Sequence, residues 1–461
     1  MKELLSRLPK VGRLLDSPEW EDIQAHCSRT QVKAALEAEL DLARQAIKAG
    51  VRQAPGPEEL LLRVEARLGR LMQVGPRPVL NGTGVIIHTN LGRSPLAQEA
   101  VMAATAAAGY CNLEMDMDSG ERGSRHAHVE ELLCRLTGAE SAMVVNNNAA
   151  AVMLALGGIA KGREGIIARG QLVEIGGSFR VPEVMEESGI RLVEVGTTNK
   201  CYLEDYRQAI GPDTGVILRV HPSNFRVVGF QQEVALAELV ALGQEHNLPI
   251  LDDLGSGTMV DLRAWGIDEP TVQESVATGA GLVCFSGDKM LGGPQCGIIV
   301  GKGHWIARLK AHPLARALRC DKITLATLAA TLGLYMQPEG WRHIPVLAML
   351  TEDIAAVEGR AEQLAGQIKS LPAKVEVVTD VSPVGGGALP LHRLETRVVR
   401  VQPENISPQA AATALRLGNI PMVVRIHEEA ILIDMRTLRG QEVALAAKAL
   451  AQAFGGDANG Q

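Results

Sequence analysis

The chain has 461 residues, of which 46% are hydrophobic, and a formal net charge of −7. This length and composition predict a globular protein of two or three domains. Because the sequence lacks both a membrane-length apolar run and a signal peptide, we expect it to be cytoplasmic, with no membrane partner. The seven cysteines show no CxxC spacing, and the chain is acidic, so the sequence argues against a disulfide framework, a zinc site and general attraction to nucleic acid.

Helical periodicity dominates residues 1–75, which we interpret as an N-terminal helical domain. A helix that begins at Pro57 places Arg63, Arg67 and Arg70 on the face opposite its leucines. Such a stripe is commonly a solvated helix face, and contact with RNA phosphates is the alternative. The segment Gly75-Pro-Arg-Pro78 breaks the pattern and indicates a domain boundary.

Short apolar runs alternate with amphipathic helices from residue 76, which predicts a doubly wound α/β domain over residues 76–339. A smaller α+β domain is expected over residues 340–461. Strands of the first domain are predicted near residues 141–145, 165–168, 191–195, 215–220, 248–251, 282–285 and 298–300. The second domain is predicted to contain strands at 375–377, 397–401, 421–425 and 430–434, with helices at 350–371 and 441–454.

An asparagine run joins one predicted strand to a helix. Residues 141–145 lead through Asn146, Asn147 and Asn148 into an Ala-rich segment that begins at Ala149. The first N–H groups of a helix are unpaired and lie at the positive end of its dipole, so a phosphate can bind there. Plain N-capping by asparagine is the alternative.

Two other predicted strands end in ionisable residues. One is followed by Asp252 and Asp253, and the other by a glycine-rich turn that contains Lys289. A lysine held between buried strands is poorly hydrated, which lowers its pKa and makes the amine a usable nucleophile. A strand-end acid and a strand-end lysine that forms a Schiff base are the pair that a pyridoxal phosphate site needs. An exposed hairpin lysine is the alternative interpretation.

Several motifs together resemble those of one family. Six segments are similar to those of the bacterial selenocysteine synthases, which are also called L-seryl-tRNA(Sec) selenium transferases. These segments are residues 90–93, 121–125, 145–149, 221–225, 252–257 and 285–295. The enzymes of this family are fold-type-I pyridoxal phosphate enzymes. The likeness covers nearly the whole chain. It implies conversion of seryl-tRNA(Sec) to selenocysteinyl-tRNA(Sec) through an aminoacrylyl-tRNA intermediate, with selenophosphate as selenium donor. It also implies a homodecameric ring and an N-terminal domain that binds tRNA.

The resemblance also assigns roles to residues of this chain. Lys289 is expected to hold the cofactor and to act as the catalytic base, and Asp252 is preferred to Asp253 as partner of the pyridine nitrogen. An aminoacyl ester has no free carboxylate, so arginines are expected to bind selenophosphate instead. The full set of candidates comprises Lys289; Asn147, Asn148, Ala149, Asp252, Ser286, His221 and Arg125 for the cofactor; Arg93, Arg316 and Arg319 for selenophosphate; and no metal ligand.

Alternatives remain for several of these expectations. Arg316 and Arg319 fit a solvated helix face equally well, and His221 fits a core histidine. For the whole protein, the alternatives are a pyridoxal phosphate lyase of a free amino acid or sugar acid, and a tRNA-binding scaffold on an inactive fold. A dehydrogenase is disfavoured because no GxGxxG motif follows the first strands.

Overall fold

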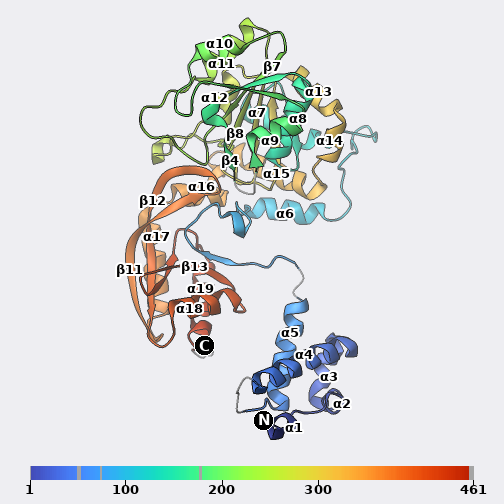
Figure 1. The fold of residues 1–461 in the computed structure, drawn as a ribbon, viewed down its shortest axis with the longest axis vertical. Helices are drawn as coiled ribbons and strands as arrows, with labels where there is room; N and C mark the ends of the chain where they lie inside the picture. The colour runs from blue at the N-terminus through green and yellow to red at the C-terminus, as the bar shows by residue number, and fades with distance from the viewer. Residues whose placement is uncertain (1, 49–52, 73–74, 176–178, 456–461) are drawn as a thin grey trace. The chain divides into compact units, whose positions relative to one another are not determined.

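The computed structural model describes residues 2–48, 53–72, 75–175 and 179–455. The chain divides into two units, Met1–Pro78 and Val79–Gln461. The division falls at the end of the Gly75-Pro-Arg-Pro78 segment. Helices make up the first unit, and two large sheets, a two-stranded sheet and flanking helices make up the second (Figure 1).

The first unit packs its helices around the buried side chains of Trp20, Leu36, Leu40 and Leu60. Leu36 and Leu40 lie on one face of the longest helix, as the 3.6-residue periodicity predicted. The elements are α1 (Lys2–Ser6), α2 (Val11–Leu15), η1 (Pro18–Trp20), α3 (Glu21–His26), α4 (Arg29–Lys48) and α5 (Pro57–Met72).

The arginine stripe of α5 is partly engaged within the chain. Arg63 forms an ion pair with Glu59 at 2.6 Å, and Arg67 forms one at 2.9 Å with Glu39, whose side chain is 8% exposed. The side chain of Arg70 lies outside the described part of the chain. The pair between Arg67 and a buried acid favours a structural role for that arginine, because an unpaired buried carboxylate would be costly.

A seven-stranded sheet forms the centre of the second unit, with the order β2-β10-β9-β8-β7-β3-β6. The pairing makes β10 the one antiparallel strand of this sheet, so the other six strands end at the same edge. This confirms the predicted doubly wound, mostly parallel sheet. Its strands are β2 (Ser141–Val145), β3 (Glu164–Ala168), β6 (Arg191–Val195), β7 (Thr214–Val220), β8 (Ile250–Gly255), β9 (Leu282–Ser286) and β10 (Gly297–Gly301).

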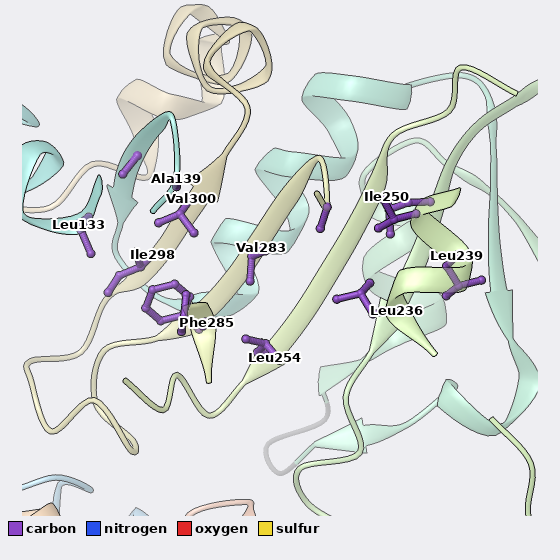
Figure 2. Packing of buried hydrophobic residues seen from close by; sticks show 14 of the residues in the cluster. Leu133, Ala139, Leu236, Leu239, Ile250, Leu254, Val283, Phe285, Ile298 and Val300 are labelled. Atoms are coloured by element: carbon purple, nitrogen blue, oxygen red, sulfur yellow. The ribbon is translucent and has the colours of Figure 1, made fainter. Parts of the chain in front are cut away.

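Helices cover both faces of this sheet, and each face has its own apolar core. On one face, Val283 and Phe285 of β9 and Leu254 of β8 pack in the same cluster as Leu236 and Leu239 of a covering helix (Figure 2). The helices on this face are α7 (Ala127–Thr137), α11 (Leu236–Glu245), α12 (Val272–Ala277) and α15 (Lys322–Tyr335). Those on the other face are α8 (Asn148–Ala160), α9 (Val181–Glu187) and α13 (Gly303–Ala311).

A five-stranded sheet with the order β1-β13-β14-β12-β11 forms the rest of the second unit. Its strands are β1 (Leu80–Gly82), β11 (Ala373–Gly385), β12 (Ala388–Pro403), β13 (Met422–His427) and β14 (Ala430–Asp434), covered by α17 (Ile354–Gln367), α18 (Pro408–Leu417) and α19 (Glu442–Ala453). Because β1 pairs with β13, a segment that the sequence assigned to the α/β domain joins the sheet of the C-terminal domain.

Shorter elements connect these layers. They are η2 (Thr89–Leu91), α6 (Gln98–Ala107), η3 (Arg169–Gln171), β4 (Glu174–Ile175), β5 (Phe179–Arg180), α10 (Leu203–Ala209), η4 (Arg263–Trp265), α14 (Pro313–Ala317), η5 (Gly340–His343) and α16 (Pro345–Thr351). The largest difference from prediction is the β11–β12 hairpin. Its strands of 13 and 16 residues greatly exceed the short strands expected near residues 375–377 and 397–401.

Candidate active site

The candidate site lies at the edge where the parallel strands end. Strand β8 ends after Asp252 and Asp253, and β9 leads into the turn that holds Lys289. At the end of β2, Asn147 and Asn148 begin helix α8. Because the carboxyl ends of parallel strands share one edge of a sheet, residues far apart in sequence converge here, which is the usual ligand-binding position in open α/β folds.

Lys289 is a buried lysine, with 5% of the residue exposed. Burial lowers the pKa of its amine, and attraction to the charge of Asp253 opposes that shift. The turn is fixed by Ser94, whose hydroxyl donates a hydrogen bond of 2.6 Å to the carbonyl oxygen of Lys289. A buried amine of lowered pKa has the properties of a nucleophile and proton carrier, so the structure excludes the exposed-hairpin interpretation.

The two strand-end acids have different partners, as the alternation of side chains along a strand requires. Asp253 accepts a hydrogen bond of 2.9 Å from the Asn148 amide and attracts Lys289. Burial raises the pKa of Asp253 to about 6. Asp252 instead forms a 2.7 Å ion pair with Arg219. These contacts favour Asp253 over the predicted Asp252, since Asp253 is the acid that shares a site with the lysine and the asparagine run.

Helix α8 begins at the asparagine run. The side chain of Asn147 caps the helix by accepting a hydrogen bond of 2.8 Å from the backbone N–H of Ala150. The predicted capping role of asparagine is thus real. It is compatible with anion binding, because one side-chain cap satisfies only one of the unpaired N–H groups of a helix N-terminus. Ala149 lies in the first turn of this helix.

Gly297 lets β10 pass close to the start of α8. A Cβ at this position would lie 2.1 Å from the carbonyl oxygen of Asn147 and 2.8 Å from the backbone nitrogen of Asn148. These are backbone atoms, so a side chain could be accommodated only if the start of α8 moved. The glycine therefore helps to fix the position of the asparagine run.

We expect Gly297→Ala to destabilise the protein by about 1–3 kcal/mol, the usual cost of overpacking. It should also weaken binding of pyridoxal phosphate, because the start of α8 must shift. Gly333→Ala is the matched control, since Gly333 lies within α15 with open space around a Cβ. That control should be neutral or slightly stabilising. Urea unfolding and cofactor titration measure both effects, and equal behaviour of the two variants would contradict the argument.

His221 belongs to a buried polar network beside the lysine. Its Nε2 lies 3.3 Å from a carboxylate oxygen of Glu269, and Ser256 donates a hydrogen bond to the other oxygen. The charge of Glu269 also acts on Lys289. Sequence reasoning missed Glu269, because it follows β8 in an irregular segment and no motif marks it. The Nδ1 atom of His221 is buried without a partner.

Arg93 is the predicted substrate-binding arginine that lies at this site. Its guanidinium forms a 2.8 Å ion pair with Asp288, the residue before Lys289, and its charge contributes to lowering the pKa of Lys289. Arg93 has a φ of 64°, in the left-handed region that non-glycine residues rarely adopt. The backbone thus holds this arginine next to the lysine in an uncommon conformation.

The remaining predicted residues have different surroundings. Arg125 forms an ion pair with Glu114 and donates a 2.7 Å hydrogen bond to the carbonyl oxygen of Cys320. Arg316 and Arg319 are exposed. Arg319 pairs through its backbone with Val145 at the end of β2, which places its segment beside the asparagine run. Ser286 is buried at the end of β9.

The residues around Lys289 fit a pyridoxal phosphate group. Asn148 Oδ1, His221 Nδ1 and Asn224 Oδ1 are buried polar atoms without a partner in the protein. Two glycines lie beside the amine, since a Cβ at Gly255 or at Gly387 would lie 4.0 Å from Lys289 Nζ; a Cβ at Gly255 would also lie 3.2 Å from Ser223 Oγ. Unsatisfied buried polar atoms near a buried amine are expected where a polar ligand binds. Among the described residues, no cluster of His, Cys, Asp or Glu forms a metal site.

Comparison with known proteins gives consistent matches. The family model "L-seryl-tRNA selenium transferase" matches residues 79–439, and the model "Selenocysteine synthase N terminal" matches residues 5–54. Three relatives named L-seryl-tRNA(Sec) selenium transferase align with nearly the whole chain. The protein from Carboxydothermus hydrogenoformans is 47% identical to this chain over 99% of both chains, and that from Moorella thermoacetica is 48% identical over 100% of this chain and 99% of the relative. The protein from Solidesulfovibrio magneticus is 49% identical over 98% of this chain and 99% of the relative.

The solved structure of D-glucosaminate-6-phosphate ammonia-lyase has the same fold. It aligns with a TM-score of 0.58 and 24% identity over 84% of this chain and 98% of the lyase. Within the described ranges, the helices are too short or too polar to cross a membrane.

Proposed function

The chain belongs to the L-seryl-tRNA selenium transferase family, and we propose from this premise that it converts L-seryl-tRNA(Sec) to L-selenocysteinyl-tRNA(Sec) as a pyridoxal phosphate-dependent enzyme. The main support is the agreement with relatives of that name over nearly the entire length of both chains. The buried Lys289, whose amine is attracted by the charge of Asp253, would supply the chemistry that this reaction requires.

Three parts of the site would hold the cofactor. Lys289 would bond to its aldehyde carbon, Asp253 would pair with the ring nitrogen, and the N-terminus of α8 at Asn148 and Ala149 would bind the phosphate. Ser286 and His221 would contribute from the ends of β9 and β7. When bound, pyridoxal phosphate provides an electron sink that makes the α-proton of the seryl group acidic.

The chain's own residues would move the proton and orient the reactants. The free amine of Lys289 would take the α-proton, because burial lowers its pKa and so favours the neutral form that can accept a proton. The same amine can return a proton to the departing β-hydroxyl. Asp253 must stay ionised opposite the ring nitrogen, and the Asn148 amide stabilises that charge by donating to it.

Selenophosphate is the proposed selenium donor, and its charge calls for cationic groups. Arg93 is the best placed, because its ion pair with Asp288 adjoins Lys289. Arg319, beside the end of β2, and Arg316 on α14 are exposed and would be further candidates for binding the same anion. Since the amino acid arrives as an ester, these arginines have no substrate carboxylate to bind.

Assembly of copies into a homodecameric ring remains a proposal based on the family resemblance. Similarity to related lyases implies that Arg125 could reach the cofactor phosphate of a neighbouring copy. In the single chain its guanidinium is engaged by Glu114 and by the carbonyl of Cys320. That role would therefore require Arg125 to exchange at least one of these partners on assembly, and analytical ultracentrifugation would measure the number of copies.

Conversion assays test the proposed activity directly. Purified protein with bound pyridoxal phosphate is incubated with seryl-tRNA(Sec) and selenophosphate, and the aminoacyl group is identified by mass spectrometry after hydrolysis. Selenocysteine formation is the expected result. Turnover of free serine or of a sugar acid, without turnover of the charged tRNA, would support the lyase alternative instead. Binding of tRNA without any turnover would support the inactive scaffold.

The N-terminal unit is proposed to bind the tRNA. Deleting residues 1–78 should leave cofactor binding intact, because the second unit contains the entire candidate site, while it weakens binding of tRNA(Sec). Affinity for tRNA should fall as salt rises, since phosphate contacts release counterions. Filter binding across a salt series measures the effect, and unchanged affinity of the truncated protein would place the tRNA site on the second unit.

A further inference from the structure

The tip of the β11–β12 hairpin reaches the candidate active site from the second sheet. Its strands flank a run of three glycines, Gly385, Gly386 and Gly387, all of which have positive φ. Val384 and Ala388, on either side of the run, are buried in the same apolar cluster as Met290, the residue after Lys289. The tip is therefore packed firmly against the turn that carries the amine.

Two of these glycines are needed for packing. A Cβ at Gly385 would lie 2.3 Å from Val85 Cγ1, and one at Gly386 would lie 2.3 Å from Ile87 Cγ2. The backbone of Ile87 also donates a 2.8 Å hydrogen bond to the carbonyl of Val384. Close approach of the tip to this segment thus explains why these two positions lack side chains.

Gly387 is different, because no protein atom blocks a side chain there. Its Cβ would lie at ordinary contact distances, 3.4 Å from Asn224 Cβ and 4.0 Å from Lys289 Nζ. The space that the missing side chain leaves is adjacent to the reactive amine. Asn224 Oδ1, a buried acceptor without a partner, belongs to the same residue that borders this space.

We propose that Gly387 and Asn224 form the wall of the pocket that receives the aminoacyl side chain, and that the absent side chain of Gly387 sets the size limit of that pocket. This inference rests on the proposed function and specifies its substrate selectivity. Asp253 and the start of α8 lie together on one face of the sheet and would hold the cofactor. Gly387 belongs to the hairpin of the other sheet and not to these cofactor-binding groups. The position beside it would therefore be available to the seryl group, whose amine would take the place of the Lys289 amine.

The proposed pocket is expected to suit a small side chain. A pocket that a single methyl group would partly fill can hold the CH2OH group of serine, and it should reject a side chain with one more carbon by about 10- to 200-fold in kcat/KM. The unpartnered Asn224 oxygen would give a polar side chain or amine a hydrogen-bond acceptor, which a purely apolar side chain could not use.

The test compares Gly387→Ala with Gly138→Ala in the full chain loaded with pyridoxal phosphate. Gly138 has a φ of 77°, close to the 69° of Gly387, and open space around its Cβ, and it caps α7 before β2 begins, at the opposite edge of the sheet. Both variants carry similar backbone strain. Gly387→Ala should lower kcat/KM for seryl-tRNA(Sec) by about 10- to 200-fold, with cofactor affinity unchanged, whereas Gly138→Ala should keep wild-type kcat/KM.

Several outcomes would overturn the inference. They are wild-type kcat/KM in Gly387→Ala, a loss of the same size in Gly138→Ala, or a parallel loss of cofactor affinity in Gly387→Ala. A measurement on the wild type covers the case in which the variant does not fold: tRNA(Sec) charged with threonine should react about 10- to 200-fold less efficiently than the seryl form, and equal rates would overturn the inference. If the wild type does not convert seryl-tRNA(Sec) at all, the proposed function fails instead.

Discussion

Lys289→Ala should abolish turnover of seryl-tRNA(Sec) and the visible absorbance of the covalently bound cofactor. The amine is the one group proposed both to bond to pyridoxal phosphate and to carry the α-proton, and its replacement removes both roles at once. General acid–base catalysis alone typically contributes about 10²–10⁴-fold, so the combined loss should be at least that large. Single-turnover kinetics and the absorption spectrum of the purified variant give the two readouts.

A matched control separates this effect from loss of charge. Lys302 forms an exposed ion pair with Glu140 at 3.0 Å, and it follows β10 at the opposite edge of the sheet. Lys302→Ala should therefore retain wild-type absorbance and turnover, because exposed pairs contribute little stability. Appreciable turnover by Lys289→Ala in the absence of added amines would refute the assignment of this lysine.

Asp253→Asn should lower kcat by at least about a hundredfold, and Asp252→Asn should have a much smaller effect. Removal of one preorganised electrostatic group in an active site commonly costs about 10²–10³-fold. Only Asp253 shares its surroundings with Asn148 and Lys289, whereas Asp252 is engaged by Arg219. Exchange of the α-proton of bound seryl-tRNA(Sec) with deuterium measures the step that depends on the ring nitrogen's partner.

The reverse ranking, with Asp252→Asn the more damaging, would restore the sequence-based choice. A structural effect of Asp252→Asn can be recognised separately. Because Arg219 would lose its ionised partner, that variant should lose stability in urea unfolding, in parallel with any loss of activity. Asp253→Asn should instead lose activity without a comparable loss of stability.

The pH dependence of the cofactor-free protein gives an independent check on Asp253. Its pKa is raised from 3.8 to about 6, so the folded chain binds more protons than the unfolded chain between these values. The stability contributed by this group is present below about pH 4 and is lost as the pH rises through 6. The unfolding free energy of Asp253→Asn should not show this decrease between about pH 4 and 6. Identical pH profiles of the unfolding free energy for the variant and the wild type would contradict the raised pKa of Asp253.

The local sequence was sufficient to predict most elements of the α/β domain and the two strand ends that carry the chemistry. Apolar runs followed by Asp252, Asp253 and Lys289 are local patterns, and the order of strands and helices restricts the sheet to a doubly wound arrangement. A strand-end lysine and a strand-end acid then had to meet, because parallel strands end at a common edge.

The tertiary structure decided the rest, because side-chain partners depend on contacts between segments that are distant in sequence. Alternation places Asp252 and Asp253 on opposite faces, and only the positions of Arg219 and α8 show which face carries the site. Glu269 and Gly387 reach Lys289 from an irregular segment and from a hairpin of the other sheet. No local sequence pattern identifies such residues, because the role of a buried carboxylate or of a glycine without a side chain depends on its neighbours in the folded chain.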